Sequence, residues 1–439
     1  MKVFKKNDKR LIRSWSMFDW ANSAYNLVIN STIFPVYYTA ITANKDTGDT
    51  VSFFGIELVN TALSNFSLSI AYLLMALGLP FISAYSDAAG KRKFFMKLFT
   101  YVGAFACMGM FFFKLETLEW GIVCFALAAI GYIGGVAFNN SYLPIIATPD
   151  QQDRVSAQGF AYGYVGCVTL QLICFVFVFK PEWFGIVDPS LPARISFLLV
   201  GLWWILFAQI PFRYLPKNRP TIGSEKMPFF QKVKNEFNTV LAEIKKIEAI
   251  RRFLPAYFFY AMGVQTLLIV AAAFGEKELQ LGSSKLIASI LLIQIVAIGG
   301  AYIMSVLAKR FGNIKVLIVV VFFWVMICCL SFFLDNEYQF YGMAFAVGLL
   351  MGGIQSLSRS TYSRLIPEHI EDTTSFFSFY DVTEKIAIVV GLFTFAFIEQ
   401  ITHNIRYSAL FLSVFFLIGF FLLFRVLKFN KLQIIQNNK

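Results

Sequence analysis

Three ionisable residues lie close together in one apolar stretch near the end of the chain. In SFFSFYDVTEKIAIVVGLFTFAF, Asp381 and Lys385 are one helical turn apart, and Glu384 precedes Lys385. A charge at the centre of a membrane helix costs about 2.5–3.5 kcal/mol, so the three must face protein or water rather than lipid. A buried carboxylate beside an ammonium can take up and release a proton. We therefore expect Asp381, Glu384 and Lys385 to couple an ion to the movement of a solute. The alternative is a static ion cluster, because Asp381 lies only about six residues, or ~9 Å, inside the expected span.

A second group of polar residues follows one face of the first apolar stretch, SWSMFDWANSAYNLVINSTIFPVYYTA. At about 100° per residue, Asp19, Asn22, Asn26 and Asn30 fall on the same side of a helix. Lipid cannot satisfy amides or a carboxylate, so this side must face other helices or water. We expect it to line the path of a polar solute. The alternative is that the asparagines only join helices by hydrogen bonds.

Other polar residues in apolar stretches are candidates for the same solute site. They are Asn139, Asn140, Tyr260, Gln265 and Gln355. Single polar residues in spans also act as packing contacts between helices. We expect spans one, four, seven and ten to form the cavity at the middle of the membrane.

A charged turn, SAYSDAAGKRKFF, follows the second apolar stretch and has the residues of a gate. Gly90 permits a tight reversal, and Arg92 lies among the bases that hold the turn on the inner side of the membrane. Asp87 can pair with a helix N-terminus or with an arginine across the inner mouth. Arg359 is the arginine that topology suggests as this partner.

The composition is that of a polytopic membrane protein. Of the 439 residues, 58% are hydrophobic and 15% are charged, against about a quarter charged in soluble proteins. Such a chain is long enough for about twelve spans of about 20 residues. The expected spans run roughly from 14 to 42, 58 to 84, 94 to 113, 119 to 147, 157 to 180, 194 to 214, 253 to 275, 285 to 308, 314 to 334, 338 to 358, 375 to 400 and 407 to 428. We expect an all-α fold of twelve transmembrane helices.

The two halves of the chain resemble each other at an offset of about 220 residues. The pair Gly134 and Gly135 recurs as Gly352 and Gly353, and the Gly90 turn recurs as LAKRFGNIK. This repetition predicts two six-helix bundles, residues 1–214 and 253–439, joined by a linker at 215–252. Lys309 takes the place of Asp87 in the second turn, so a latch through Asp87 would belong to one half only.

The linker sequence and the net charge of +12 both indicate contact with the surface of the membrane. Apolar residues recur at three and four positions in the linker, which predicts an amphipathic helix on the cytoplasmic leaflet; a helix that binds a calmodulin-like partner is the alternative. Most Lys and Arg residues fall on the side of the N-terminus, so both termini are expected in the cytoplasm, facing anionic lipid. This distribution explains the charge better than nucleic-acid binding does. The histidines have no cysteine partners and no nucleotide-binding motif is present, so we expect no metal, no cofactor and no enzymatic activity.

Several segments resemble the major facilitator superfamily and, within it, the vacuole-effluxer-like family. They are MFDWANSAYNLVINSTIFPVYY, RVSAQGFAYGYVG from Arg154, QSLSRSTYSRLIP from Gln355, and FFSFYDVTEK. The resemblance implies a carrier that works by alternating access, with Asp19, Asn22 and Asn26 in the family's Asp-Trp-Ala-Asn-Ser segment. Fungal members of the family are associated with the export of amino acids from the vacuole, and a bacterial member is expected here.

We therefore expect a monomeric secondary transporter in a bacterial inner membrane, driven by an ion gradient, with protons as the expected ion. The cargo is expected to be a small polar solute, an amino acid or a related zwitterion, because asparagines and a carboxylate-ammonium set suit both signs of charge. Alternatives are an exporter of another small metabolite or drug-like compound, and a scaffold or sensor that kept the carrier fold.

Overall fold

The computed structural model describes residues 5–42, 50–217, 229–370, 372–402 and 404–437. Eleven helices in this part of the chain are long and apolar enough to cross a membrane. One more crossing is made by the first helical stretch, in which α1, η1 and α2 follow one another without a break. The crossing segments are α1 (Lys9–Ala24), η1 (Tyr25–Ile33), α2 (Phe34–Thr42), α3 (Asn60–Ala88), α4 (Arg92–Gly109), α5 (Leu118–Asn140), α7 (Gln152–Phe179), α8 (Leu191–Tyr214), α10 (Glu248–Leu279), α11 (Ser283–Phe311), α12 (Asn313–Ser331), α13 (Glu337–Leu365), α14 (Thr373–Thr402) and α15 (Ile405–Asn437). The expected fold of twelve membrane-spanning helices is confirmed.

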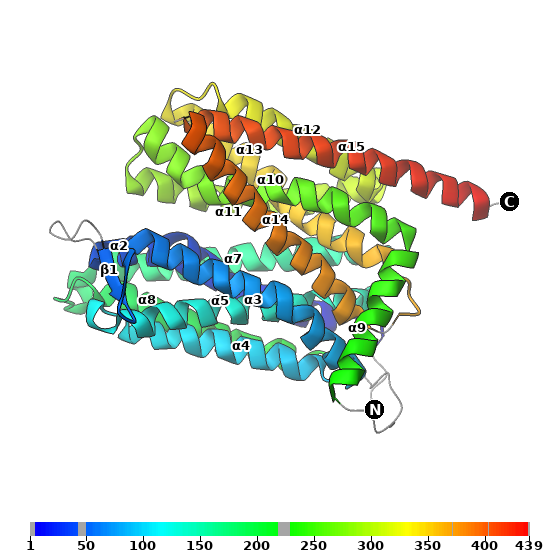
Figure 1. The fold of residues 1–439 in the computed structure, drawn as a ribbon, viewed down its shortest axis with the longest axis horizontal. Helices are drawn as coiled ribbons and strands as arrows, with labels where there is room; N and C mark the ends of the chain where they lie inside the picture. Colours follow the sequence, from blue (N-terminus) through cyan, green and yellow to red (C-terminus); the bar gives the residue numbers. More distant parts are fainter. Residues whose placement is uncertain (1–4, 43–49, 218–228, 371, 403, 438–439) are drawn as a thin grey trace.

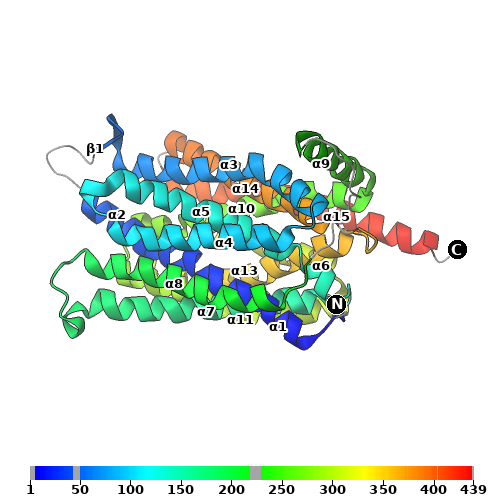
Figure 2. The ribbon, with the colours of Figure 1, turned by 90° about the horizontal axis from the view of Figure 1, so that it is seen from below.

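The helices form two bundles, which we call the first half (α1 to α8) and the second half (α10 to α15). One buried apolar cluster runs from Leu11 to Leu215, and another from Val240 to Val426 with Tyr164 added. Both ends of the described chain lie at the same end of the molecule (Figures 1 and 2), which we call the terminal face; the opposite end is the far face. The domain boundaries expected at residues 214 and 252 stay a prediction.

The first crossing is not a uniform α-helix. Between Tyr25 and Ile33 it widens into a π-helix, in which Ser31 donates a hydrogen bond to the carbonyl of Asn26 and Thr32 to that of Leu27. A π-helical turn holds more residues than an α-helical one, so positions after it rotate relative to positions before it. Along the expected polar stripe, Asp19 and Asn22 lie buried before the π-helix, while Asn26 is exposed and Asn30 partly exposed within it. That the stripe lines a solute path stays a prediction.

Small residues let helices approach closely, as the glycine pattern predicts. A Cβ on Gly131 of α5 would lie 2.4 Å from the Cα of Gly103 on α4, and one on Gly352 of α13 would lie 2.0 Å from the carbonyl oxygen of Ala297 on α11. The two repeated turns also match, because Gly90 and Gly312 adopt positive φ angles of 66° and 89°. The internal echo between the halves thus appears in backbone geometry as well as in sequence.

Two adjacent glycines on α11 provide a test of this packing. A Cβ on Gly299 meets nothing within 4 Å, whereas a Cβ on Gly300 lies 2.2 Å from the carbonyl oxygen of Leu349 on α13. Gly299→Ala should stabilise the protein by about 0.5–1 kcal/mol through helix propensity. Gly300→Ala should destabilise it by about 1–3 kcal/mol, because backbone must move. Opposite shifts of the unfolding midpoint in detergent are expected, and equal shifts would contradict the α11–α13 contact.

Two segments outside the crossings differ from expectation. The loop after the first crossing contains a hairpin of β1 (Thr50–Phe53) and β2 (Ile56–Val59), closed by Phe54 and Gly55, both at positive φ. The linker helix α9 (Phe229–Lys246) runs beside α3 at the terminal face (Figure 1). Its Val240 and Ile244 are buried in the second-half cluster, so at these positions it packs on protein rather than on lipid.

The remaining short helical segments join the crossings. They are η2 (Met110–Phe112), η3 (Leu115–Thr117), α6 (Leu143–Ile146) and η4 (Pro181–Phe184).

Candidate functional site

A buried ion pair joins the two halves of the protein. Arg359 Nη1 on α13 lies 3.1 Å from Asp19 Oδ2 on α1, and both side chains are nearly inaccessible, at 4% and 11% exposed. The same guanidinium donates to Asn140 Oδ1 at 3.2 Å and, through Nε, to Ser156 Oγ at 3.0 Å. It also lies over the Phe160 ring, 4.1 Å from its centroid. Arg359 is thus held by three segments of the first half.

The asparagines at the end of α5 extend this network. Asn139 donates to Asp19 Oδ1 at 3.1 Å, and Asn140 donates to Asp381 Oδ1 on α14 at 3.5 Å. Asn22 is also buried, and its Nδ2 has no hydrogen-bond partner among the described residues. Asp19 and Asp381, predicted for separate purposes, therefore lie in one connected cluster with Arg359.

The acidic turn after α3 contacts the second half, but not through the expected arginine. Asp87 pairs with Arg92 of its own turn at 3.0 Å. Its other carboxylate oxygen accepts from the backbone N–H of Ser375 at 2.8 Å, at the start of α14. Thr374 accepts from Arg92 Nε at 2.6 Å. The suggested Asp87–Arg359 pair was wrong, because Arg359 lies deeper and is taken by Asp19. The other alternative, an acid at a helix N-terminus, is confirmed.

The second half has an equivalent contact in which the acid comes from the opposite side. Asp153, at the start of α7, pairs with Arg364 Nη2 of α13 at 2.5 Å and accepts from Asn313 Nδ2. Asn313 is the first residue of α12, directly after the Gly312 turn. The acid missing at Lys309 is therefore supplied by α7 of the first half.

The other ionisable pair of α14 lies further from the terminal face. Lys385 Nζ is 2.8 Å from Glu384 Oε2, and Gln265 Nε2 on α10 donates to Glu384 Oε1 at 2.7 Å. Lys385 also reaches the first half, where its Nζ lies 5.8 Å from the ring centroid of Tyr72 on α3. Glu384 and Lys385 are partly accessible, at 19% and 14%.

Of the remaining predicted residues, some are buried and hydrogen-bonded, and others are exposed. Tyr260 is buried and hydrogen-bonded to Ser358 within the second half, at 2.7 Å. Gln355 accepts from Tyr164 of the first half at 2.8 Å. Asn26 is exposed and Asn30 is partly exposed, with Asn30 donating to Asn26 at 3.3 Å. Tyr260 is therefore a packing contact in this conformation.

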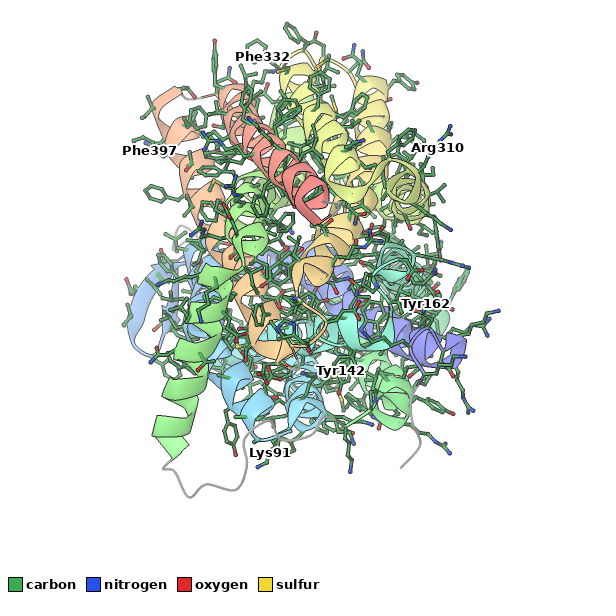
Figure 3. All side chains as sticks on the ribbon, turned by 90° about the vertical axis from the view of Figure 1, so that its right-hand side faces the viewer. Lys91, Tyr142, Tyr162, Arg310, Phe332 and Phe397 are labelled. Carbon is green, nitrogen blue, oxygen red and sulfur yellow. The ribbon has the colours of Figure 1, made fainter. Side chains whose placement is uncertain are left out.

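These contacts between the halves are arranged in layers. Depth from the terminal face follows from the rise of 1.5 Å per residue in a helix. Asp153 and Arg364 lie within the first turn from the terminal ends of α7 and α13. Asp19 and Arg359 lie about 9–15 Å along their helices, and Lys385 lies about 18 Å along α14. We call the contacts between the halves from the Asp153–Arg364 pair, through the Asp19–Arg359 pair, to the Gln355–Tyr164 hydrogen bond the terminal seal. A cavity of about 570 Å³ at the terminal face, lined by residues of both halves, lies outside it. Viewed from this face, first-half residues lie in the lower part and second-half residues in the upper part, with Tyr142 near the middle (Figure 3).

Several residues of the seal were not predicted. Ser156, Asp153, Asn313 and Arg364 were passed over because charged and polar residues near helix ends are expected from topology alone. Tyr72 was missed because a tyrosine in an apolar span has no distinguishing pattern. The partners of the seal residues lie between 47 and 211 positions away, and Lys385 lies still further along the chain from Tyr72. Sequence periodicity carries no information at such separations.

Comparison with known proteins places this geometry in context. Residues 7–431 match the family described as "Vacuole effluxer Atg22 like". The chain is 29% identical to the MFS-type transporter YxiO of Bacillus subtilis, over 96% of this chain and 95% of that one. It is 24% identical to autophagy-related protein 22 of Kluyveromyces lactis, over 83% and 79% of the two chains.

Solved structures share the fold at low sequence identity. The transporter FucP in its outward conformation has a TM-score of 0.72 at 13% identity, with 94% of this chain and 98% of that one covered. The human organic anion transporter MFSD10 has a TM-score of 0.73 at 13% identity, with 95% and 100% covered. Both are transporters, and at 13% identity each likeness shows the fold alone.

Proposed function

The chain belongs to the vacuole effluxer Atg22-like family, and from this premise we propose that it moves a small zwitterionic solute, an amino acid or a close relative, coupled to protons. The protein is a multi-pass secondary transporter with the major facilitator fold, and not an enzyme. Its small-molecule cargo and its place in a lipid membrane follow from that.

One observation supports the proposal above the others. The terminal seal closes one side of the protein with buried ion pairs, and the Glu384–Lys385 pair lies just beyond it, still partly accessible. A carrier needs a barrier that can break and a polar site beside it. The exposed Asn26 and the partly exposed Asn30 lie further along the first crossing, toward the far face, where facing lipid would be costly. We propose that they, Gln265 and Glu384 bind the cargo.

The seal suggests the conformational cycle. We propose that the structure is the state closed toward the terminal face, and that breaking Asp19–Arg359 and Asp153–Arg364 opens it. We propose that this face lies in the cytoplasm, because the positive-inside rule assigns the side richer in basic residues to it, and that the membrane is the inner (plasma) membrane of a bacterium, since one relative comes from Bacillus subtilis. Protonation of Glu384 would remove the charge that holds an ammonium beside it, which gives the proton its coupling function. We propose a monomer, because one chain contains both halves.

Ligand-dependent stabilisation tests the function. Purified protein should unfold at a higher temperature with the cargo present, since a ligand at 100 times its Kd stabilises by about 2.7 kcal/mol. We expect a shift with one or more amino acids in a screen of amino acids, short peptides, sugars and cationic drugs. A shift with sugars or drugs alone would contradict the zwitterion proposal. A cooperative transition that no solute moves would favour a scaffold or sensor.

A further inference from the structure

Lys385 is held in an unusual way. It belongs to α14 of the second half, yet its ammonium lies near Tyr72 of the first half, 5.8 Å from the ring centroid. Its ion-pair partner is the preceding residue, Glu384, at 2.8 Å. Neighbouring residues on a helix do not face each other, so this pair lacks the facing arrangement of residues one turn apart. Another ammonium group could therefore take the place of Lys385 beside Glu384.

The ionisable groups around Lys385 are one cation short. The central cluster contains three carboxylates, Asp19, Asp381 and Glu384, against the cations Arg359 and Lys385. Arg359 is taken by Asp19, and Asp381 Oδ2 has no hydrogen-bond partner among the described residues. A low-dielectric site with an uncompensated negative charge favours a further cation. A proton or a cargo ammonium satisfies it.

We propose that Lys385 is a tethered competitor for the cargo: its ammonium occupies the place, between Glu384 and Tyr72, that a primary ammonium of the cargo takes. The cargo ammonium displaces it, and the released Lys385 pairs with the cargo carboxylate. This inference rests on the proposed function and names the recognised group. Gln265 holds Glu384 in place throughout, by its hydrogen bond at 2.7 Å.

The exchange explains a preference for zwitterions. A zwitterion brings one ammonium for Glu384 and one carboxylate for Lys385, so both of these residues stay paired. A simple amine would displace Lys385 from Glu384 and leave Lys385 unpaired. A simple acid would find Lys385 still paired with Glu384, so its own carboxylate would be unpaired. An unpaired charge is costly in a desolvated site. Removing Lys385 should therefore reverse the preference, because an amine then fills a vacant place.

The test is amine binding by Lys385→Ala. We expect n-butylammonium, which resembles the lost side chain, to raise the unfolding midpoint of this variant in a dose-dependent way and to bind at least ~10-fold more tightly than to wild type, a difference of about 1.4 kcal/mol. Lys285→Ala is the matched control, since it removes a lysine paired with Glu337 at an exposed site and should gain no amine binding. Adding Glu384→Gln to Lys385→Ala should abolish the gain.

The outcomes separate this inference from the proposed function. If Lys385→Ala does not fold, Lys385→Gln leaves the same place vacant with a polar chain and should show the same gain. Wild type that binds amino acids, with a folded Lys385 variant that gains no amine binding, overturns the tethered competitor and leaves the cargo proposal intact. A gain of amine binding without amino-acid binding by wild type supports the ammonium place and overturns the zwitterion cargo.

Discussion

Replacing Asp19 by Asn is expected to open the terminal face and to reduce net transport to a small fraction of the wild-type rate. The change leaves Arg359 buried without its anion, and breaking a buried ion pair on one side costs about 3–5 kcal/mol. The cost falls on the sealed state, because Arg359 is desolvated by first-half contacts that exist only when the halves meet. A change of ~3 kcal/mol shifts the equilibrium between sealed and open states roughly 100-fold.

Accessibility of a buried position in the seal measures the opening. Ala157 on α7 is fully buried beside Ser156, so a cysteine placed there should react slowly with a water-soluble maleimide in wild type and much faster with Asp19→Asn. The native cysteines supply the background, measured without Ala157→Cys. Unchanged labelling together with retained transport would contradict a gating function for the pair.

A double variant separates gating from general damage. Asp19→Asn with Arg359→Gln removes both charges, so it should recover part of the stability that Asp19→Asn loses, since no ion is left unpaired. Glu278→Gln is the surface control: its pair with Arg406 is about one-fifth exposed, and pairs with access to solvent contribute about 0–1 kcal/mol. A double variant no more stable than Asp19→Asn would mean that the polar contacts of Asp19, rather than its charge, hold the seal.

The architecture could be predicted because membrane physics leaves few choices. Apolar runs of about 20 residues must be helices, and the repeated glycines and turns indicate two related bundles. The π-helix in the first crossing could not be predicted. Within it, the side-chain hydroxyls of Ser31 and Thr32 donate to carbonyls five residues earlier, contacts that uniform α-helical spacing does not anticipate. The hairpin closed by Phe54 was equally hidden, because phenylalanine is not a residue expected at positive φ.

The site was predictable by residue and not by pairing. Polar identity in an apolar span marked Asp19, Asn139 and Asn140, and topology marked Arg359 as part of a gate. All four lie in one network. Which side chains meet depends on how the two bundles dock. Arg359 and Asp19 are 340 positions apart, and both were assigned different tasks. Asp153 was missed for the same reason: its position at the start of a helix gives no sign of its contact with the second half, which depends on how the two bundles dock.

Glu384→Gln is expected to abolish uptake driven by a pH gradient in proteoliposomes. Gln keeps the size of the side chain and an acceptor for Gln265, but it cannot bind or release a proton, so its pairing with Lys385 no longer responds to pH. Uptake with an inward or outward proton gradient should fall to the level of protein-free liposomes, whichever direction drives the wild type. Exchange of labelled for unlabelled cargo should persist at raised cargo concentration, because exchange needs no net proton movement.

The comparison with Asp381 determines which carboxylate carries the proton. Asp381 lies one turn nearer the terminal face and accepts from Asn140 within the seal, so Asp381→Asn should slow both exchange and gradient-driven uptake without separating them. Glu384→Gln should separate them, losing the gradient response while retaining exchange. Glu278→Gln, far from both, should leave the two activities at wild-type levels. Gradient-driven uptake that survives in Glu384→Gln and disappears selectively in Asp381→Asn would move the coupling function one turn along α14 and leave Glu384 as a binding residue only.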